Sequence, residues 1–332
     1  MQVVKLGKTG VSVSKLAMGG LFVSSVGGEF EQAKQAVERA VKLGVNYVDT
    51  APTYANSEEV LGKILENIDA PLVISTKIGG RPKPFEPRNK DHIRASIEES
   101  LRLLKRDRVD ILMVHEPDRP GQYDWWTNWQ TMDGPALEVL HELRDQGVIK
   151  YLGLGGTTAY EMAHIIRSGK FDVVLTAFNY SLLWREAEIE VIPAATAQGM
   201  GIVVGSPLQQ GALSRRFDAQ LDDPALYWLS PRRKAQFKTL YTFLDETGMS
   251  ITEMAIRFVI SNPAIHTVLM GARSAAEVDS NVAAVARGPL PKDILARLDE
   301  IYAMVPYRPF AEPFGLGWRL GNPSSYRGPG AG

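Results

Sequence analysis

Short apolar runs alternate with segments of helical spacing along most of this chain. Eight runs are almost continuously apolar, which is typical of parallel strands that are covered by helices on one side. Helical patterns separate the runs, so the order is that of repeated βα units, and eight units close a (β/α)8 TIM barrel. The predicted strands are Lys15–Met18, Tyr47–Thr50, Leu72–Lys77, Val109–His115, Ile149–Leu154, Val173–Phe178, Ile202–Ser206 and Thr267–Met270.

The helical segments carry their own start and stop signals. Between Lys90 and Leu104 the apolar residues recur at steps of four, four and three, which predicts one buried helix face. Ser57 precedes two glutamates and is a predicted N-cap, while Pro135 follows Gly134 where another helix can begin. Four glycines close helical patterns in the position that favours a left-handed residue: Gly44, Gly147, Gly169 and Gly199.

The connections that follow some strands are unusually long. Thr9-Gly10 indicates the turn of an N-terminal β-hairpin, and an extra helix is predicted around Arg232–Leu244. Because loops after barrel strands form the functional rim, we expect long rim loops to line a substrate pocket. These segments are Glu116–Asp133, Gln209–Gly248 and the tail Pro306–Gly332. Residues 306–332 are expected to pack over the barrel, with a frayed end, and residues 1–332 to form a single domain.

Composition limits the classes of partner. The chain has 332 residues, 45% of them apolar, and 37 basic against 38 acidic side chains, so no strong field favours nucleic acid or an anionic membrane. It has no cysteine, which excludes a disulfide framework and a thiolate nucleophile. The start MQVVKLGKTG lacks the apolar run of a signal peptide, and no stretch is apolar enough for a membrane span. We therefore expect a cytoplasmic enzyme.

Four polar side chains lie at or just after the ends of neighbouring predicted strands. Asp49 and Tyr54 follow the second strand, Lys77 ends the third and His115 ends the fourth. A hydride that reaches a carbonyl carbon creates an alkoxide, which needs a proton donor and nearby positive charge or hydrogen bonds. Tyr54 is the candidate donor, with Lys77 favouring its phenolate, Asp49 holding Lys77 and His115 orienting the substrate oxygen. Each residue alone has a structural explanation, and it is the set that predicts carbonyl reduction.

These residues lie in a wider pattern that resembles the aldo-keto reductase superfamily. The resemblance covers nearly the whole chain and implies a barrel oxidoreductase with NAD(P)(H) across the rim and Tyr54 as acid and base. Within it, the chain is similar to a bacterial branch of aldose (galactose and threo-aldose) dehydrogenases, which implies a carbonyl or sugar substrate. The matching segments are Leu6–Gly20, Asp49–Gly62, Ser75–Lys77, Asp110–His115, Gly205–Leu213 and Gly271–Asn281.

The resemblance also implies a set of cofactor contacts, with one departure. Gly153-Leu-Gly155-Gly156 replaces the usual Gly-Val-Ser-Asn, and Ala177 replaces a glutamine, so the side chains that hold the nicotinamide amide are altered. We interpret the glycines as a tight strand-to-helix turn. The implied cofactor residues are Gly19, Gly20, Asp49, Gly155, Gly156, Ser206, Pro207, Leu208, Gly211, Leu213, Gly271, Arg273, Glu277 and Asn281.

Cofactor choice and substrate contacts stay open. Arg273 suits the 2′-phosphate of NADP, whereas Glu277 suits the free ribose of NAD, so we favour NADP slightly and keep NAD as the alternative. Aromatic faces suit sugars and apolar aldehydes equally, and loop packing is an equal alternative. The candidate substrate contacts are Tyr54, His115, Trp125, Trp126 and Trp129.

The sequence disfavours three rival functions. A metal-dependent barrel hydrolase needs clustered ligands, but the five histidines are scattered, so no metal is predicted. A serine hydrolase lacks its G-x-S-x-G elbow. The main alternative is a non-catalytic, cofactor-binding regulatory subunit with the same barrel, which retention of all four candidate catalytic residues disfavours. Substrate, direction of reaction and oligomeric state are not determined by the sequence.

Overall fold

The barrel predicted from the apolar runs is confirmed in the computed structural model, which describes residues 1–223 and 229–308. Eight parallel strands close in the order β10-β3-β4-β5-β6-β7-β8-β9, because β10 pairs with both β3 and β9. The strands are β3 (Leu16–Gly19), β4 (Tyr47–Asp49), β5 (Val73–Ile78), β6 (Val109–His115), β7 (Ile149–Gly156), β8 (Val173–Ala177), β9 (Gly201–Gly205) and β10 (Thr267–Met270).

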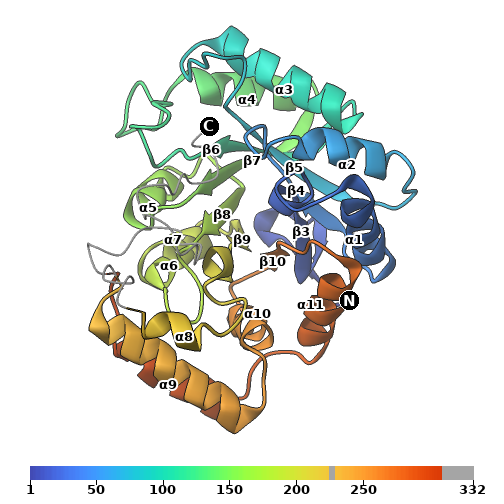
Figure 1. Cartoon of the computed structure of the whole chain (residues 1–332). Helices are drawn as coiled ribbons and strands as arrows, with labels where there is room; N and C mark the ends of the chain where they lie inside the picture. The colour runs from blue at the N-terminus through green and yellow to red at the C-terminus, as the bar shows by residue number, and fades with distance from the viewer. Residues whose placement is uncertain (224–228, 309–332) are drawn as a thin grey trace.

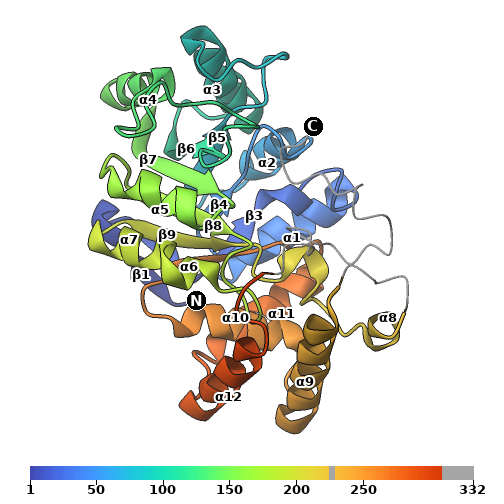
Figure 2. The same cartoon turned by 90° about the vertical axis from the view of Figure 1, so that its left-hand side faces the viewer.

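Helices surround the strands, as Figure 1 shows. Helix α9 lies at the edge of the molecule in both views and packs on α12 (Figures 1 and 2). None of the helices in the described ranges is long and apolar enough to cross a membrane. The helices are α1 (Phe30–Lys42), α2 (Ser57–Leu65), α3 (Lys90–Leu104), α4 (Pro135–Asp145), α5 (Tyr160–Arg167), α6 (Glu186–Ile189), α7 (Val191–Ala197), α8 (Asp218–Leu221), α9 (Pro231–Thr247), α10 (Ile251–Ser261), α11 (Ala275–Ala286) and α12 (Lys292–Ala303).

A hairpin closes the N-terminal end of the barrel. Strands β1 (Val3–Lys5) and β2 (Ser12–Ser14) pair antiparallel, as expected for the turn at Thr9-Gly10. Their Leu6 and Val13 side chains join one buried cluster with side chains from the strands, such as Tyr47 and Met113. The Tyr151 hydroxyl, from β7, donates to the carbonyl of Thr9 at 2.8 Å. The hairpin therefore seals one end, and the C-terminal end of the barrel is where a ligand can enter.

Most helix signals are confirmed, and one is wrong. Helix α3 has the predicted bounds, and Pro135 is the first residue of α4. Ser57 is not the N-cap of α2 but its first residue, because its hydroxyl donates instead to the carbonyl of Gly20 at 2.7 Å and accepts from Thr50. The serine thus joins the ends of β3 and β4. All four predicted stop glycines have positive φ: Gly44 (88°), Gly147 (75°), Gly169 (73°) and Gly199 (63°).

The interpretation of the β7 glycines as a strand-to-helix turn is wrong. Strand β7 runs on to Gly156, which pairs with Thr176 of β8. A Cβ on Gly156 would lie 2.5 Å from Oδ1 of Asp118, so the residue is a glycine because of close packing. The extra helix predicted around Arg232–Leu244 is confirmed as α9. Of the expected tail, residues 309–332 lie outside the described ranges.

Candidate active site

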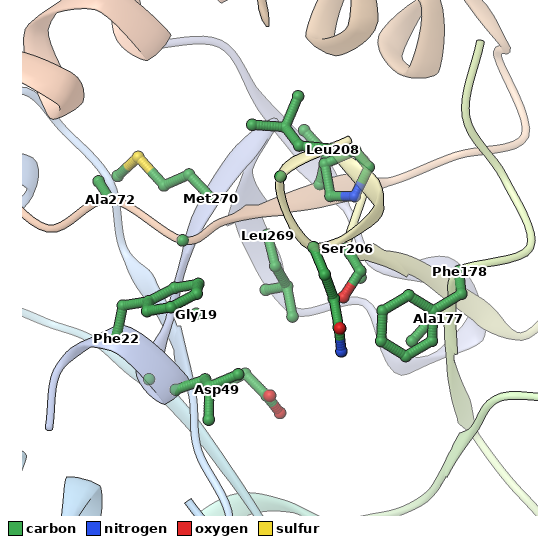
Figure 3. Close-up of a pocket in the computed structure, with 18 of the residues that line it drawn as sticks. Gly19, Phe22, Asp49, Ala177, Phe178, Ser206, Leu208, Leu269, Met270 and Ala272 are labelled. Carbon is green, nitrogen blue, oxygen red and sulfur yellow. The ribbon is translucent and has the colours of Figure 1, made fainter. Parts of the chain in front are cut away.

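A cavity of about 1060 Å³ opens at the C-terminal ends of the barrel strands. Its lining combines residues that end strands with residues of the loops that follow, which is where barrel enzymes place their sites. Figure 3 shows Phe22 and Phe178 at opposite sides of this space, with Asp49 and Leu269 between them. The volume is at the upper end of the usual range for ligand sites, so the cavity can hold more than one small molecule.

The four residues predicted to do chemistry all line this cavity. The Lys77 ammonium lies 2.7 Å from Oδ2 of Asp49 and donates to the carbonyl of Thr50 at 2.8 Å. It also lies 4.8 Å from the centre of the Tyr54 ring. The side chains of Lys77 and Asp49 are 1% and 2% exposed, so this ion pair is shielded from solvent. An acid, a cation and a phenol are thus in contact at the ends of two adjacent strands.

A second set of hydrogen bonds fixes the carboxylate of Asp49. The Ser75 hydroxyl donates to Oδ1 of Asp49 at 2.6 Å, and the Tyr47 hydroxyl donates to Ser75 at 3.0 Å. Both oxygens of the aspartate are therefore used, one by a hydroxyl and one by Lys77. A buried ion pair needs such additional bonds to offset the cost of removing charge from water. The arrangement holds the ammonium in one position against the phenol.

Opposing effects set the protonation of Tyr54 and Lys77. Burial raises the pKa of Tyr54 from its ordinary value, Lys77 acts in the opposite direction, and the negative charges of Asp49 and Glu116 add to the rise. Lys77 therefore lowers the pKa of Tyr54, as predicted, but burial raises this pKa by more. Burial lowers the pKa of Lys77, yet Asp49 and Tyr54 outweigh burial and the net pKa is raised. Around neutral pH the lysine is charged and the tyrosine carries its proton.

His115 lies beside the tyrosine at the end of β6. The ring centres of Tyr54 and His115 are 6.0 Å apart, and the rings are nearly perpendicular at 79°. Nδ1 of His115 lies 3.4 Å from the hydroxyl of Thr53. Burial, and then the charge of Lys77, hold the pKa of His115 well below its usual value. The imidazole is therefore neutral near pH 7 and can share a hydrogen bond with a substrate oxygen.

Every residue implied to contact a cofactor lines the cavity except Leu213. Leu213 is fully buried and its N–H donates to the carbonyl of Leu208, so it shapes the loop rather than meeting a ligand. At the start of α11 the Arg273 guanidinium lies 4.3 Å from the centre of the Phe22 ring. The Glu277 carboxylate accepts from the N–H of Arg273 at 2.7 Å, while the Ser274 hydroxyl accepts from the N–H of Glu277. The two residues that bear on cofactor choice are thus in contact.

The three tryptophans of the β6 loop are not part of the cavity lining, contrary to expectation. Trp125 and Trp126 are buried, and their indole N–H groups donate to the carbonyls of His115 and Pro117 at 2.8 and 2.9 Å. Trp129 stacks on His164, with ring centres 5.2 Å apart. A buried indole needs a hydrogen-bond acceptor, and the loop backbone supplies it. These residues hold the loop that follows β6 against the end of that strand, where His115 lies.

Several lining residues were missed by the sequence reasoning. Phe22 and Phe178 supply aromatic faces, and Glu116 and Thr157 supply polar groups. Their place directly after a strand could have indicated two of them, because Phe178 follows β8 and Glu116 follows β6. Within the described ranges no group of three or more histidines, aspartates and glutamates is placed to hold a metal ion.

The comparisons with known proteins agree with this geometry. Residues 15–303 match the model of the Aldo/keto reductase family. The chain belongs to that family. Family membership and the oxidoreductase relatives support NAD(P)-dependent oxidoreduction in general.

Three relatives show the range of the family. The chain is 29% identical to the L-galactose dehydrogenase of Arabidopsis thaliana over 290 residues, 84% of this chain and 86% of that protein. It is 27% identical to a D-threo-aldose 1-dehydrogenase of Pseudomonas sp over 297 residues, 81% and 88% of the two chains. It is also 26% identical to a probable voltage-gated potassium channel subunit beta of Arabidopsis thaliana, over 93% of this chain and 99% of that protein.

The residues present fit a nicotinamide dinucleotide. The cavity has the required size, and residues of the first turns of α11 line it. A helix N-terminus attracts anionic groups such as phosphates. Arg215 and Arg273 bring two guanidinium groups to the lining, and Phe22 brings an aromatic face. This donor set suits the phosphates and the aromatic rings of such a cofactor.

Proposed function

We propose that the protein transfers a hydride between a nicotinamide cofactor and the carbonyl or alcohol carbon of an aldehyde, ketone or aldose. One observation carries the proposal: the Tyr54 phenol lies against the buried pair of Lys77 and Asp49, beside a neutral His115. Such a set supplies what carbonyl reduction needs, namely a proton donor and charge stabilisation where an alkoxide forms.

Four side chains of this protein have separate roles in the proposed reaction. A nicotinamide cofactor, when bound, would supply or accept the hydride. In reduction the Tyr54 hydroxyl gives its proton to the developing alkoxide, and in oxidation the phenolate takes the proton from the alcohol. Lys77 stabilises the phenolate by its charge, and Asp49 holds Lys77 in place. Neutral His115 hydrogen-bonds to the substrate oxygen and orients it for the transfer.

An aldose is the substrate class that we favour. Two of the relatives are named for sugars, as an L-galactose dehydrogenase and a D-threo-aldose 1-dehydrogenase. The cavity lining mixes polar groups such as Glu116, Thr157 and Ser206 with aromatic faces, which is the combination that sugars require.

For the cofactor we propose NADP, with NAD as the alternative. The carboxylate of Glu277 is bound to the backbone N–H of Arg273 and not to its guanidinium, so the exposed guanidinium, which lies against the Phe22 ring, can meet a 2′-phosphate. Arg273→Ala should then weaken NADPH binding about 10-fold or more and change NADH binding little, as read by cofactor fluorescence in parallel titrations. Exposed Arg297→Ala is the control. Tighter NADH binding that is unaffected by Arg273→Ala would remove the phosphate role.

A screen tests the function. Purified protein is assayed with aldoses and aldehydes, with both cofactors and in both directions, by the absorbance of the reduced nicotinamide. We expect turnover of at least one aldose or hydroxylated aldehyde. The second candidate function is a regulatory subunit, which the potassium channel subunit beta relative favours. Cofactor binding without any turnover would support that candidate and contradict the enzyme proposal.

A further inference from the structure

A carboxyl group that the proposed chemistry does not use lines the cavity next to the catalytic set. Glu116 directly follows His115, is 3% exposed and lines the cavity. Its backbone has φ of 47° and its N–H donates to the carbonyl of Gly155 at 2.7 Å. A left-handed conformation is uncommon for a residue with a side chain, and here it belongs to a residue that lines a site.

Hydrogen bonds fix the position of this carboxyl group. The Thr157 hydroxyl donates to Oε2 of Glu116 at 2.7 Å. Oδ2 of Asp118 accepts from the backbone N–H groups of Thr157 and Thr158 at 3.0 and 2.5 Å, which ties the loop after β6 to the end of β7. Glu116 is therefore held between two neighbouring strand ends and does not adapt freely to a ligand.

Two glycines form the neighbouring part of the wall, where close packing leaves no room for a Cβ. Positions 155 and 156 are glycines, and both line the cavity. A Cβ at Gly155 would lie 3.2 Å from Cε of Lys77, and one at Gly156 would lie 2.3 Å from Sδ of Met162. Glu116 and Thr157 line the cavity beside these glycines. Glu116 directly follows His115 and its charge acts on Tyr54, so a substrate held between Tyr54 and His115 brings the carbon next to its reacting carbon toward Glu116.

We propose that Glu116 is a specificity-determining residue that accepts a hydrogen bond from a substrate hydroxyl on the carbon next to the reacting carbon. This inference rests on the proposed function. A carboxylate accepts hydrogen bonds only, and a hydroxyl is the donor that a sugar or hydroxyaldehyde offers. When an analogue without the hydroxyl binds, the carboxylate is removed from water and receives no hydrogen bond in exchange. This costs free energy, so the site should reject such analogues.

The charge state of Glu116 makes the proposal sensitive to pH. Burial first, and then the negative charge of Asp118, raise the pKa of Glu116 to about 7, although Thr157, Arg119 and Lys77 act in the opposite direction. As pH rises through about 7 the carboxyl group loses its proton and becomes a pure acceptor, so preference for a hydroxylated substrate should increase. The charged groups that shift the pKa of Glu116 are Lys77, Asp118 and Arg119. The charge of Glu116 in turn raises the pKa values of Tyr54 and Tyr123.

The experiment compares two substrates that differ by one hydroxyl. Lactaldehyde and propanal are reduced by the wild type, Glu116→Gln and Glu116→Ala, and the ratio of their kcat/KM values is measured from pH 6 to 8.5. The matched control is Glu161→Gln, an exposed residue of α5. Thr157→Val removes the hydroxyl that holds Glu116, and its ratio should fall less than that of Glu116→Ala. Cofactor titrations and thermal unfolding confirm that each variant is folded and binds the dinucleotide.

We expect the wild-type ratio to rise with pH through about 7, to become flat in both Glu116 variants, and to fall about 10-fold or more in Glu116→Ala. Equal losses for both substrates, or an unchanged ratio in both variants, would overturn the role of Glu116 while leaving the oxidoreductase in place. A wild type that binds cofactor and reduces neither aldehyde would contradict the proposed function, and this inference with it.

Discussion

The buried ammonium group of Lys77 is central to the proposed proton transfer by Tyr54. Moving such a charge out of water costs several kcal/mol, and Asp49, the carbonyl of Thr50 and the Tyr54 phenol offset this cost. Apolar side chains in place of both Lys77 and Asp49 would fill the same space without the penalty. We infer that the charge is kept for its effect on Tyr54, whose pKa burial raises and Lys77 lowers.

Replacing that charge should therefore move the pH profile of the oxidation direction. Oxidation needs the phenolate, so its rate rises as pH passes the pKa of Tyr54. Lys77→Met removes the effect that lowers this pKa, and the alkaline rise of kcat/KM should shift to higher pH, with a loss of rate at pH 8. Lys77→Arg keeps a positive charge and should shift the rise less. An unshifted rise in a folded Lys77→Met protein would remove the electrostatic role.

Tyr54→Phe isolates the proton donor itself. The ring and its packing are retained, and only the hydroxyl is lost. We expect kcat to fall about 10²-fold or more, the usual scale of lost acid and base catalysis, with the Kd of the cofactor unchanged. Tyr151→Phe, which removes a hydroxyl bonded to Thr9 at the other end of the barrel, is the control. Undiminished turnover would take Tyr54 out of its role.

Individual residues differ in how far the sequence could predict them. The four catalytic candidates were predictable because each lies at or just after a strand end, and parallel strands bring these ends together. The tryptophans were not, because the direction of a loop side chain depends on its bonding partner. Trp125 turns inward to reach the carbonyl of His115, and the neighbouring Glu116 occupies the cavity wall instead.

The end of strand β7 and the contact between α2 and α3 could not be predicted from the local sequence pattern. The apolar runs predicted all eight strands, but β7 extends two residues beyond the apolar run because glycines there are required by packing rather than by a turn. Gly62 of α2 gives a second case. It is buried in a helix interior, where alanine is normally preferred, yet its Cβ would lie 2.0 Å from the carbonyl oxygen of Leu103 in α3.

Gly62→Ala tests which of these effects dominates. Helix propensity would stabilise the alanine by about 1 kcal/mol. The clash with the Leu103 backbone must instead push α2 from α3, and overpacking of this kind costs about 1–3 kcal/mol. We expect a net loss of stability and a lower urea midpoint. Gly121→Ala, where an added Cβ meets nothing within 4 Å, is the control. A raised midpoint for Gly62→Ala would contradict the packing explanation.

The cavity exists only because the barrel closes. Its lining includes residues from Leu16 of β3 to Asn281 of α11. The barrel closes because β10 pairs with both β3 and β9. Counting eight βα units was enough to predict this architecture. It was not enough to predict the depth of burial at the site, which sets the pKa directions of Tyr54 and His115.

The central claim is hydride transfer, and isotope transfer tests it most directly. Purified protein is mixed with reduced nicotinamide cofactor that carries deuterium at C4 of either face, together with an aldehyde or aldose, and the alcohol is analysed by mass spectrometry. We predict that one of the two labelled cofactors places one deuterium on the former carbonyl carbon and that Tyr54→Phe slows the transfer. A cofactor complex that forms but never transfers the label, from either face and with any substrate of the screen, would contradict the account.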